Sequence, residues 1–236
     1  MYGLKEDWHK VEEALTNIIP FYHLVNRLIS FGKDIKLRRE GIKRAIGSEG
    51  LVLDAGCGPG IMSEILLERW KGELVLLDSL KTMLKIAKSK VIGEGVNALF
   101  EYLPFKDESF DLIMLGFSFR DAKDMNKTLK EIYRVLKKEG RLLIVDLGKP
   151  DNSILRFFSI LYLKYLVPLI AFILVGGRGL YYSALYTTYK SYPTNKKLRK
   201  ILEEKFKISF FLEDLLGGAI VIIGEKMNSK SPLQLP

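Results

Sequence analysis

A glycine-rich turn between two apolar segments is the first part of the sequence that could do chemistry. Residues 51–60 read LVLDAGCGPG, so Gly56, Gly58 and Gly60 follow a short apolar run and precede an amphipathic one. Glycine tolerates a left-handed backbone and lets a ligand approach closely, while a helix N-terminus adds unpaired N–H groups. The pattern predicts a nucleotide-type cofactor. Its G-x-G-x-G spacing differs from the G-x-G-x-x-G of pyrophosphate-binding turns and disfavours a nicotinamide dinucleotide.

Acidic residues stand at the ends of the two apolar segments around this turn. Asp78 ends the second segment, 18 positions after Gly60. A carboxylate there can accept hydrogen bonds from both hydroxyls of a ribose, and a helix cap for residues 79–83 is the alternative. Asp54 is expected to orient the turn. Cys57 has no base or second cysteine near it in the sequence, which favours a small loop residue over a nucleophile.

Short apolar runs alternate with amphipathic ones through the middle of the chain, which predicts parallel βαβ units. The first fifty residues read as helices at 6–18 and 21–46, with a break near Gly32. The expected strands are 50–54, 74–78, 98–102, 111–116 and 141–147, and the expected helices between them are 61–70, 82–90 and 123–138. A helix at 195–205 and strands near 207–212 and 219–226 close the chain.

One segment breaks this alternation. Residues 154–175 read ILRFFSILYLKYLVPLIAFILV, and the longest uncharged run, 165–177, is shorter than the roughly 20 residues that cross a bilayer. Pro168 stands in its middle. We therefore expect a helical element that covers a pocket or rests on a membrane surface, rather than a span, and a buried core helix remains open.

The composition is that of a globular protein with a basic surface. The 236 residues are 48% hydrophobic and 28% charged, with a net charge of +9. Such a charge suits nucleic acid, a membrane surface or an acidic substrate, and a lysine- and glutamate-rich surface of the heat-adapted kind is the alternative. The basic clusters 33–44 and 196–200 contain no interleaved aromatic residues, so nucleic acid is not expected. No metal site is predicted.

The cysteine content and the N-terminus bear on location. A single cysteine excludes an intrachain disulfide and fits a reducing compartment. No secretory signal pattern follows Met1, so the expected location is cytoplasmic.

Several segments resemble the class I S-adenosylmethionine-dependent methyltransferases, and more closely the UbiE/MenG-like C-methyltransferases of ubiquinone and menaquinone biosynthesis. The resemblance rests on the turn at 51–60 together with 22–32 (YHLVNRLISFG), 103–111 (LPFKDESFD), 117–124 (FSFRDAKD), 134–150 (RVLKKEGRLLIVDLGKP), 186–193 and 216–226. It runs from about residue 22 to residue 226.

The resemblance implies an α/β fold with a Rossmann-like, seven-stranded, mostly parallel sheet whose last strand is antiparallel. N-terminal helices (1–48) would pack on a cofactor-binding core (49–150). An apolar helical cap (151–193) would follow the fifth strand, before a C-terminal helix and strands (194–228) and a flexible tail (229–236).

The cofactor implied by the resemblance is S-adenosylmethionine, with Asp54 holding its ammonium group through water. The implied contacts are Asp54, Gly56, Cys57, Gly58, Gly60, Asp78, Ser79, Leu99, Phe100, Glu101 and Gly116. The chain departs from the family at Leu99, where an acidic or amide residue usually binds the adenine amino group. We expect the backbone of Phe100 and the carboxylate of Glu101 to replace that contact.

The implied reaction is methylation of a ring carbon in an apolar, polyprenylated quinol-type substrate. Arg120 would stabilise the developing phenolate, because a guanidinium stays charged, and water, His23 or Asp121 would relay the proton. Tyr22 completes the expected catalytic set. Two members depart from the family, which has an asparagine at Asp121 and an acidic residue at His23. The alternatives are a surface pair for Arg120 and Asp121, a solvated His23 and a packing role for Tyr22.

The resemblance leaves the acceptor and the surroundings of the enzyme open. The apolar segment and the basic clusters are compatible with peripheral contact with an anionic membrane surface. Another lipid or small-molecule acceptor, a basic nucleic-acid-binding protein with a degenerate Rossmann domain, and a dinucleotide-dependent oxidoreductase are the rival interpretations. The oligomeric state does not follow from the sequence.

Overall fold

The computed structural model describes residues 2–47 and 50–227. The tail expected at 229–236 lies outside the described residues.

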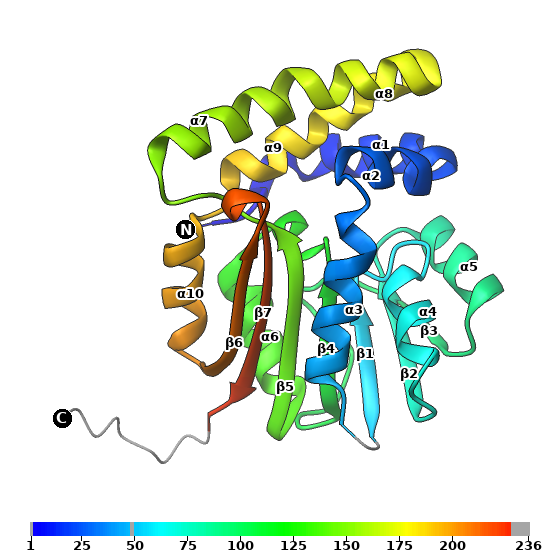
Figure 1. Ribbon diagram of the computed structural model, residues 1–236. Helices are drawn as coiled ribbons and strands as arrows, with labels where there is room; N and C mark the ends of the chain where they lie inside the picture. The colour runs from blue at the N-terminus through cyan, green and yellow to red at the C-terminus, as the bar shows by residue number, and fades with distance from the viewer. Residues whose placement is uncertain (1, 48–49, 228–236) are drawn as a thin grey trace.

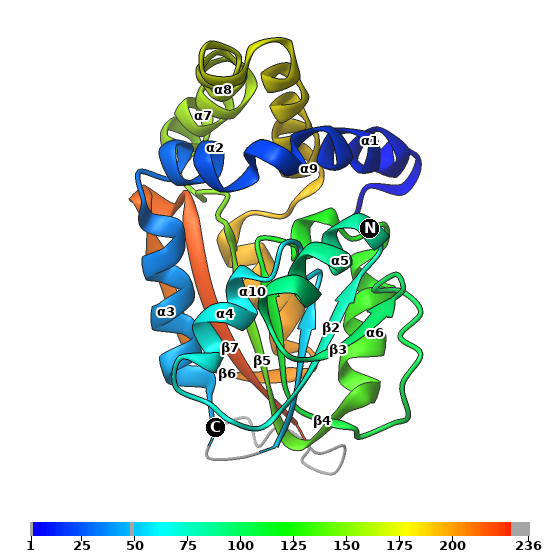
Figure 2. The ribbon, with the colours of Figure 1, turned by 90° about the vertical axis from the view of Figure 1, so that its right-hand side faces the viewer.

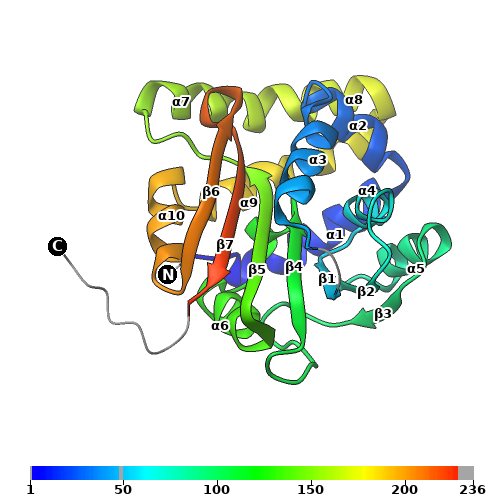
Figure 3. The ribbon, with the colours of Figure 1, turned by 60° about the horizontal axis from the view of Figure 1, so that its bottom comes forward.

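Seven strands form one mixed sheet in the order β3-β2-β1-β4-β5-β7-β6, which Figure 3 shows from one end to the other. Strand β7 runs antiparallel to both of its neighbours, and every other pairing is parallel. The central strands are apolar on both faces because helices cover both sides. The strands are β1 (Leu51–Ala55), β2 (Glu73–Asp78), β3 (Glu94–Asn97), β4 (Phe110–Gly116), β5 (Leu136–Leu147), β6 (Phe206–Asp214) and β7 (Ala219–Lys226). The predicted fold class is confirmed.

Helices cover the two faces of the sheet and enclose two separate apolar cores. Figure 1 shows α3 in front of the sheet and α6 behind it. One face carries α3 (Lys33–Ala45), α4 (Ile61–Leu67) and α5 (Lys81–Lys90), and the other carries α6 (Met125–Val135) and α10 (Asn195–Glu203). Helix α6 begins at a side-chain cap, because Asp124 accepts hydrogen bonds from the N–H groups of Asn126 and Lys127.

A helical cap lies over the carboxyl ends of the parallel strands (Figure 2). It combines α1 (Trp8–Ile18) and α2 (Tyr22–Ile29) with α7 (Ser153–Leu161), a π-helical turn (Tyr162–Leu166), α8 (Val167–Val175), a 3-10 segment (Gly176–Ser183) and α9 (Ala184–Ser191). By length and composition the helical run Ser153–Ser191 could cross a membrane, yet only 22% of its most apolar window is buried within the protein. The buried core helix considered for this segment is therefore wrong.

The run from α7 to α9 is not one straight rod. The chain reverses after α8, and the backbone of Gly179 packs so closely on α8 that an added Cβ would lie 2.2 Å from the carbonyl carbon of Ala171. Figure 1 shows α9 returning beneath α7 and α8.

Two element predictions are wrong. The third strand is Glu94–Asn97 and not 98–102, because an exposed edge strand carries no apolar signal. Residues 98–102 instead form a loop, which Glu101 anchors on α6 by accepting a hydrogen bond from the N–H of Asp124 at 3.0 Å. The helix expected at 123–138 ends at Val135, and β5 begins at Leu136.

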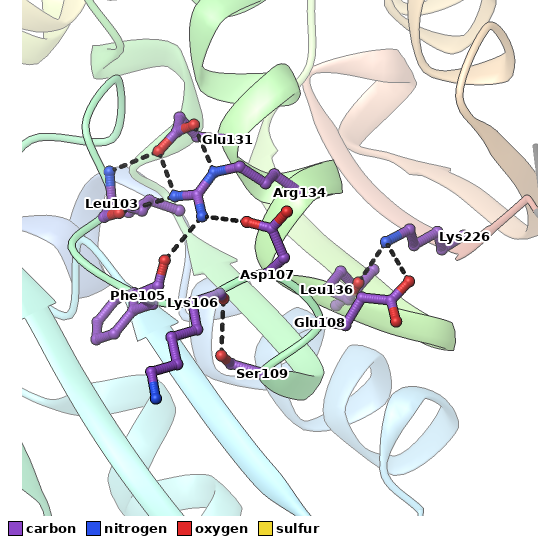
Figure 4. Close-up of polar contacts among 10 residues, drawn as sticks. All are labelled: Leu103, Phe105, Lys106, Asp107, Glu108, Ser109, Glu131, Arg134, Leu136 and Lys226. Carbon is purple, nitrogen blue, oxygen red and sulfur yellow. Dashed lines mark hydrogen bonds and ion pairs between the residues drawn. The ribbon is translucent and has the colours of Figure 1, made fainter.

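The motif at 103–111 is held in place by hydrogen bonds and ion pairs to helix α6 (Figure 4). Arg134 on α6 donates to the carbonyl groups of Leu103 at 2.9 Å and Phe105 at 2.7 Å. Its guanidinium also pairs with Glu131 and Asp107, both at 2.8 Å. These contacts fix the chain that leads from the 98–102 loop into β4.

Candidate functional site

Two cavities meet above the carboxyl ends of the parallel strands, which is where ligands bind in open α/β sheets. The first is a crevice along the glycine turn. The second is an apolar cavity of about 500 Å³ between the cap and α3. Both are lined by Leu15, Tyr22, Arg38 and Phe117. A ligand in one cavity would therefore contact a ligand in the other.

The glycine turn is built so that its own N–H groups are satisfied within the protein. Gly56 adopts φ +69°, and a Cβ there would lie 2.6 Å from the Cβ of Ser118, so only glycine fits. The donated bonds run from Gly56 and Cys57 to the Leu77 carbonyl, from Gly58 to the Asp78 carboxylate, and from Gly60 to the Cys57 carbonyl. A pyrophosphate would need such N–H groups free. The turn therefore suits a cofactor that lacks one.

Asp78 binds the backbone at the start of α5 and also lines the crevice. One carboxylate oxygen accepts from the N–H of Gly58 at 2.8 Å and the other from the N–H of Leu80 at 2.8 Å, at the start of α5. The residue is 8% exposed and lines the crevice beside Ser79. Burial raises its pKa. Its remaining lone pairs are the acceptors that a ribose would meet.

Asp54 is fully buried below the crevice and does not line it. Its Oδ2 accepts from the Oγ of Ser63 at 2.6 Å, which orients α4. Its Oδ1 has no hydrogen-bond partner among the described residues. Burial raises the pKa of this carboxyl to about 6.

The opposite end of the crevice is lined mainly by apolar side chains. Leu99 and Phe100 line it, and Trp8 of α1 joins them from the cap. Glu101 also lines the crevice, but its Oε1 is occupied by the N–H of Asp124 and the hydroxyl of Thr128. Trp8 was missed in the sequence, where the helical spacing of α1 was the only signal.

Arg120 and Asp121 lie in a buried 3-10 turn after β4, so the surface pair considered for them is wrong. Arg120 donates from Nη1 to Asp146 Oδ1 at 2.6 Å and to the Phe117 carbonyl at 2.6 Å. Asp121 lies 3.7 Å from the Nε of Arg120, and its Oδ1 has no hydrogen-bond partner within the described part of the chain. Burial raises the pKa of Asp121 to about 7, despite the neighbouring guanidinium.

Of the other two expected catalytic residues, one lines the cavities and the other does not. Tyr22 lines both cavities, and burial raises its pKa. His23 lines neither cavity, is exposed, and has its Nε2 3.2 Å from the Nζ of Lys90. Burial and the charge of Lys90 lower its pKa. His23 is therefore a solvent-exposed histidine, and its position does not support a role in proton transfer.

Arg38 and Phe117 are site residues that sequence reasoning missed. Arg38 belongs to the basic cluster at 33–44, which was read as surface, but it is 4% exposed. Its guanidinium carbon lies 4.7 Å from the ring centroid of Phe117, a residue at φ +60°. Its spacing from Leu37 and Ile42 along α3 was the available signal.

No cluster of three or more potential metal ligands occurs within residues 2–47 and 50–227.

Gly116 at the end of β4 lines the crevice, and a Cβ there would lie 2.3 Å from the Nη1 of Arg38.

This strand order, with the glycine turn after β1 and an acidic residue ending β2, is the fold of the class I S-adenosylmethionine-dependent methyltransferases, and a match to a family model shows that the chain is one of them. A sequence model of the ubiE/COQ5 methyltransferase family matches residues 1–225, and the chain belongs to that family. S-adenosylmethionine is therefore its cofactor. The described residues fit this cofactor, because the N–H groups of the glycine turn are bonded within the protein, Asp78 is buried beside the turn, and the other end of the crevice is apolar enough for an adenine ring.

Named relatives agree with this assignment. The chain is 32% identical to the Wigglesworthia glossinidia brevipalpis ubiquinone/menaquinone biosynthesis C-methyltransferase UbiE over 228 residues, covering 90% of this chain and 88% of the relative. It is 34% identical to the Thermotoga maritima demethylmenaquinone methyltransferase over 195 residues, covering 80% and 84%.

Among solved structures, a S-adenosylmethionine-dependent, possible histamine N-methyltransferase from Thermotoga maritima superposes with a TM-score of 0.63 at 21% identity, covering 93% of this chain and 100% of that one. A S-adenosylmethionine-dependent methyltransferase from Aquifex aeolicus gives 0.58 at 17% identity, covering 87% and 98%. At these identities the likeness shows the fold.

Replacing Asp78 tests the cofactor end of the site. We expect Asp78→Ala to weaken S-adenosylmethionine binding about 100-fold, because hydrogen bonds to a charged group contribute about 1.5–3 kcal/mol each. Isothermal titration calorimetry measures the change. Asp107→Ala, which removes the same charge from an exposed loop residue, serves as the control and should bind normally. Unchanged affinity in Asp78→Ala would show that the ribose is held elsewhere.

Proposed function

We propose that this methyltransferase methylates a ring carbon of a polyprenylated quinol in quinone biosynthesis. The supporting observation is the apolar cavity of about 500 Å³ that shares four wall residues with the cofactor crevice. The relatives are named for ubiquinone, menaquinone and demethylmenaquinone methylation. Two tyrosines with buried, unpartnered hydroxyls in the described structure, Tyr182 and Tyr189, also line the cavity and offer donors to quinol oxygens.

For this reaction the protein must position the methyl donor and the acceptor and must transfer one proton. When bound, S-adenosylmethionine supplies a methyl group on a positively charged sulfur. Useful separations for in-line transfer are about 3–3.5 Å, and the shared wall at Tyr22 and Phe117 is where the two ligands would meet. The ring carbon becomes nucleophilic when a neighbouring hydroxyl is deprotonated.

Asp121 is the residue that we assign as proton acceptor. It lines the crevice, its Oδ1 is unpaired within the described residues, and a pKa of about 7 keeps about half of it ionised near neutral pH. Its carboxylate would take the hydroxyl proton, which would leave the ring carbon able to accept the methyl group that bound S-adenosylmethionine supplies. Water then removes the ring proton, which restores aromaticity.

We propose that Arg120, which lines the apolar cavity, positions the turn rather than stabilising a phenolate. Its Nη1 is paired with Asp146, so its charge is already balanced before a phenolate forms. It holds the turn that carries Asp121 and is a positioning residue.

Transfer of labelled methyl to a reduced prenylated naphthoquinone lacking its ring methyl tests the acceptor. We expect the quinol to be labelled and the oxidised quinone to remain unlabelled, because only the quinol has a hydroxyl to deprotonate. The product is identified by mass spectrometry. Labelling of a phospholipid or small metabolite, but not of the quinol, would support the alternative acceptor class while leaving the methyltransferase assignment intact.

The Asp121→Asn variant tests the proton acceptor. In the wild type, kcat/KM should rise with pH through about 7 as the carboxyl ionises, and then level off. The variant should lose about 100-fold in kcat together with this limb of the profile. A variant that retains the limb would assign the titration to another group.

The protein also presents an apolar surface that we assign to membrane contact. Exposed apolar side chains lie on the cap, on the turn between α2 and α3 and on the turn between β6 and β7, and together they form what we term the apolar cap surface: Leu24, Leu28, Phe31, Ile154, Phe157, Phe158, Leu161, Leu166, Leu169, Phe172, Ile173, Leu174, Leu180, Leu215 and Leu216. A patch of this kind marks an interaction site. Phe31 and Leu216, at 73% and 76% exposure, adopt positive φ and flank the apolar cavity.

The charges around this surface favour an anionic bilayer. Residues 153–191 contain four basic residues, Arg156, Lys164, Arg178 and Lys190, and no acidic one. The basic cluster at 33–44 contributes little, because Arg38 is buried and Arg39 and Arg44 pair with Glu68 and Glu40. We propose a cytoplasmic enzyme that rests on the membrane surface and takes its lipid substrate from it.

Removing the two most prominent apolar side chains tests the membrane contact. The Phe31→Ser/Leu216→Ser double variant should bind phosphatidylglycerol/phosphatidylcholine vesicles about tenfold more weakly, since interfacial binding scales with buried apolar area. Vesicle co-sedimentation measures this. The control is Ile92→Ser, at 92% exposure between α5 and β3 and outside the apolar cap surface. Equal binding by both variants and the wild type would rule out this surface.

A further inference from the structure

One wall of the apolar cavity carries polar side chains at a regular spacing. Tyr22, Asn26, Ser30, Asp34 and Arg38 all line the cavity and recur every fourth residue from α2 into α3. Residues four apart on a helix lie on the same face, so each helix turns its polar members toward the cavity. Most other residues of the wall are apolar or aromatic. This polar row therefore has a role that a prenyl chain does not require.

Asp34 is the acidic member of the row and is buried in the cavity wall. The residue is 7% exposed, and its Oδ1 accepts a hydrogen bond from the Oγ of Ser30 at 3.0 Å, while its Oδ2 accepts none from the described residues. The nearby cations bind elsewhere, because Lys33 pairs with Asp214 at 3.0 Å and Arg38 donates to a backbone carbonyl. Burying a carboxylate with one neutral partner is unfavourable. A ligand that donates a hydrogen bond to Oδ2 would offset that cost.

The position of Asp34 indicates which part of the acceptor it would meet. Tyr22 and Arg38 line both cavities, whereas Asp34 lines only the apolar one. Asp34 precedes Arg38 by one helical turn, which places the Cβ atoms of such residues about 6 Å apart. The two oxygens of a 1,4-quinol stand on opposite sides of the ring at a similar separation. With the reacting side of the ring at the shared wall, the other oxygen therefore reaches Asp34.

A carboxylate at this place distinguishes the two redox forms of the ring. It accepts hydrogen bonds and donates none. A quinol hydroxyl donates to it, whereas a quinone carbonyl only accepts, so two oxygens with facing lone pairs would repel each other. The hydroxyls of Tyr182 and Tyr189 donate or accept and therefore fit either form. Asp121, with a pKa of about 7, is partly protonated near neutral pH and also fits either form.

We propose that Asp34 makes the acceptor cavity selective for the reduced ring by accepting a hydrogen bond from the hydroxyl that does not react. This inference rests on the proposed quinol acceptor and deepens it. The oxidised quinone is then excluded when it binds, and not only because it lacks a proton for Asp121 to take. A further consequence is that the quinone does not compete with the quinol for the cavity.

Binding of the two redox forms without turnover isolates this contact. Equilibrium dialysis under argon, with S-adenosylhomocysteine present, compares a geranylated 1,4-naphthoquinol kept reduced by dithionite with the corresponding naphthoquinone. The wild type should prefer the quinol about 100-fold. Asp34→Asn keeps the shape of the side chain but adds N–H groups that donate to a carbonyl. It should bind the quinone about tenfold better than the wild type does and lose most of the preference.

Two controls accompany the variant. Glu40→Gln makes the same exchange of carboxylate for amide on α3, at a residue that pairs with Arg44 and does not line the cavity, and should keep the wild-type preference. Affinity for S-adenosylhomocysteine should be unchanged in Asp34→Asn, because Asp34 does not line the crevice, and this reports an intact fold. A gain in quinone affinity is also not a result that misfolding produces.

Two outcomes would overturn the proposal alone: a wild type that binds quinol and quinone equally, and an Asp34→Asn variant that keeps the wild-type preference. A wild type that binds S-adenosylhomocysteine but neither form of the ring would remove the proposed quinol acceptor itself, and this inference with it.

Discussion

The buried ion pair between Arg120 and Asp146 joins the three parts of the protein on which the site depends. Asp146 lies near the end of β5 and accepts from both the backbone N–H and the Nη1 of Arg120. The same guanidinium reaches Thr188 of α9 in the cap at 3.2 Å. Sheet, turn and cap are thereby held in one arrangement. Removing one partner of such a pair leaves an uncompensated buried charge, which costs about 3–5 kcal/mol.

Around this pair the protein keeps several polar groups incompletely satisfied. Asp54, Asp121 and Arg38 each have a buried atom without a partner in the described structure. Buried polar groups are normally paired, and exceptions concentrate where a ligand or a reaction will use them. Phe117, which lines both cavities, has a positive φ, and this backbone strain further lowers the stability of the folded state at the same place. Stability is therefore given up where the two substrates are proposed to meet.

The sequence predicted those parts of the structure that depend on local chemistry. The glycine turn, Asp78 and the alternation of strands and helices follow from backbone freedom and hydrophobic periodicity. Strand β3 did not, because Glu94–Asn97 is a polar edge strand. The partners of Arg120 and Arg134 could not be predicted either, because Asp146 and Leu103 reach them only through the tertiary fold. Arg38 was hidden for a similar reason, inside a run of surface lysines and arginines.

We propose that a donor in the glycine-turn crevice faces an acceptor ring in the apolar cavity, across Tyr22 and Phe117. A crystal structure with S-adenosylhomocysteine and a prenylated quinol tests it most directly. The ribose should lie on Asp78, the quinol hydroxyl should be within hydrogen-bond reach of Asp121, and the prenyl chain should run toward Phe31 and Leu216. A quinol ring bound outside the apolar cavity, or a ribose far from Asp78, would contradict it.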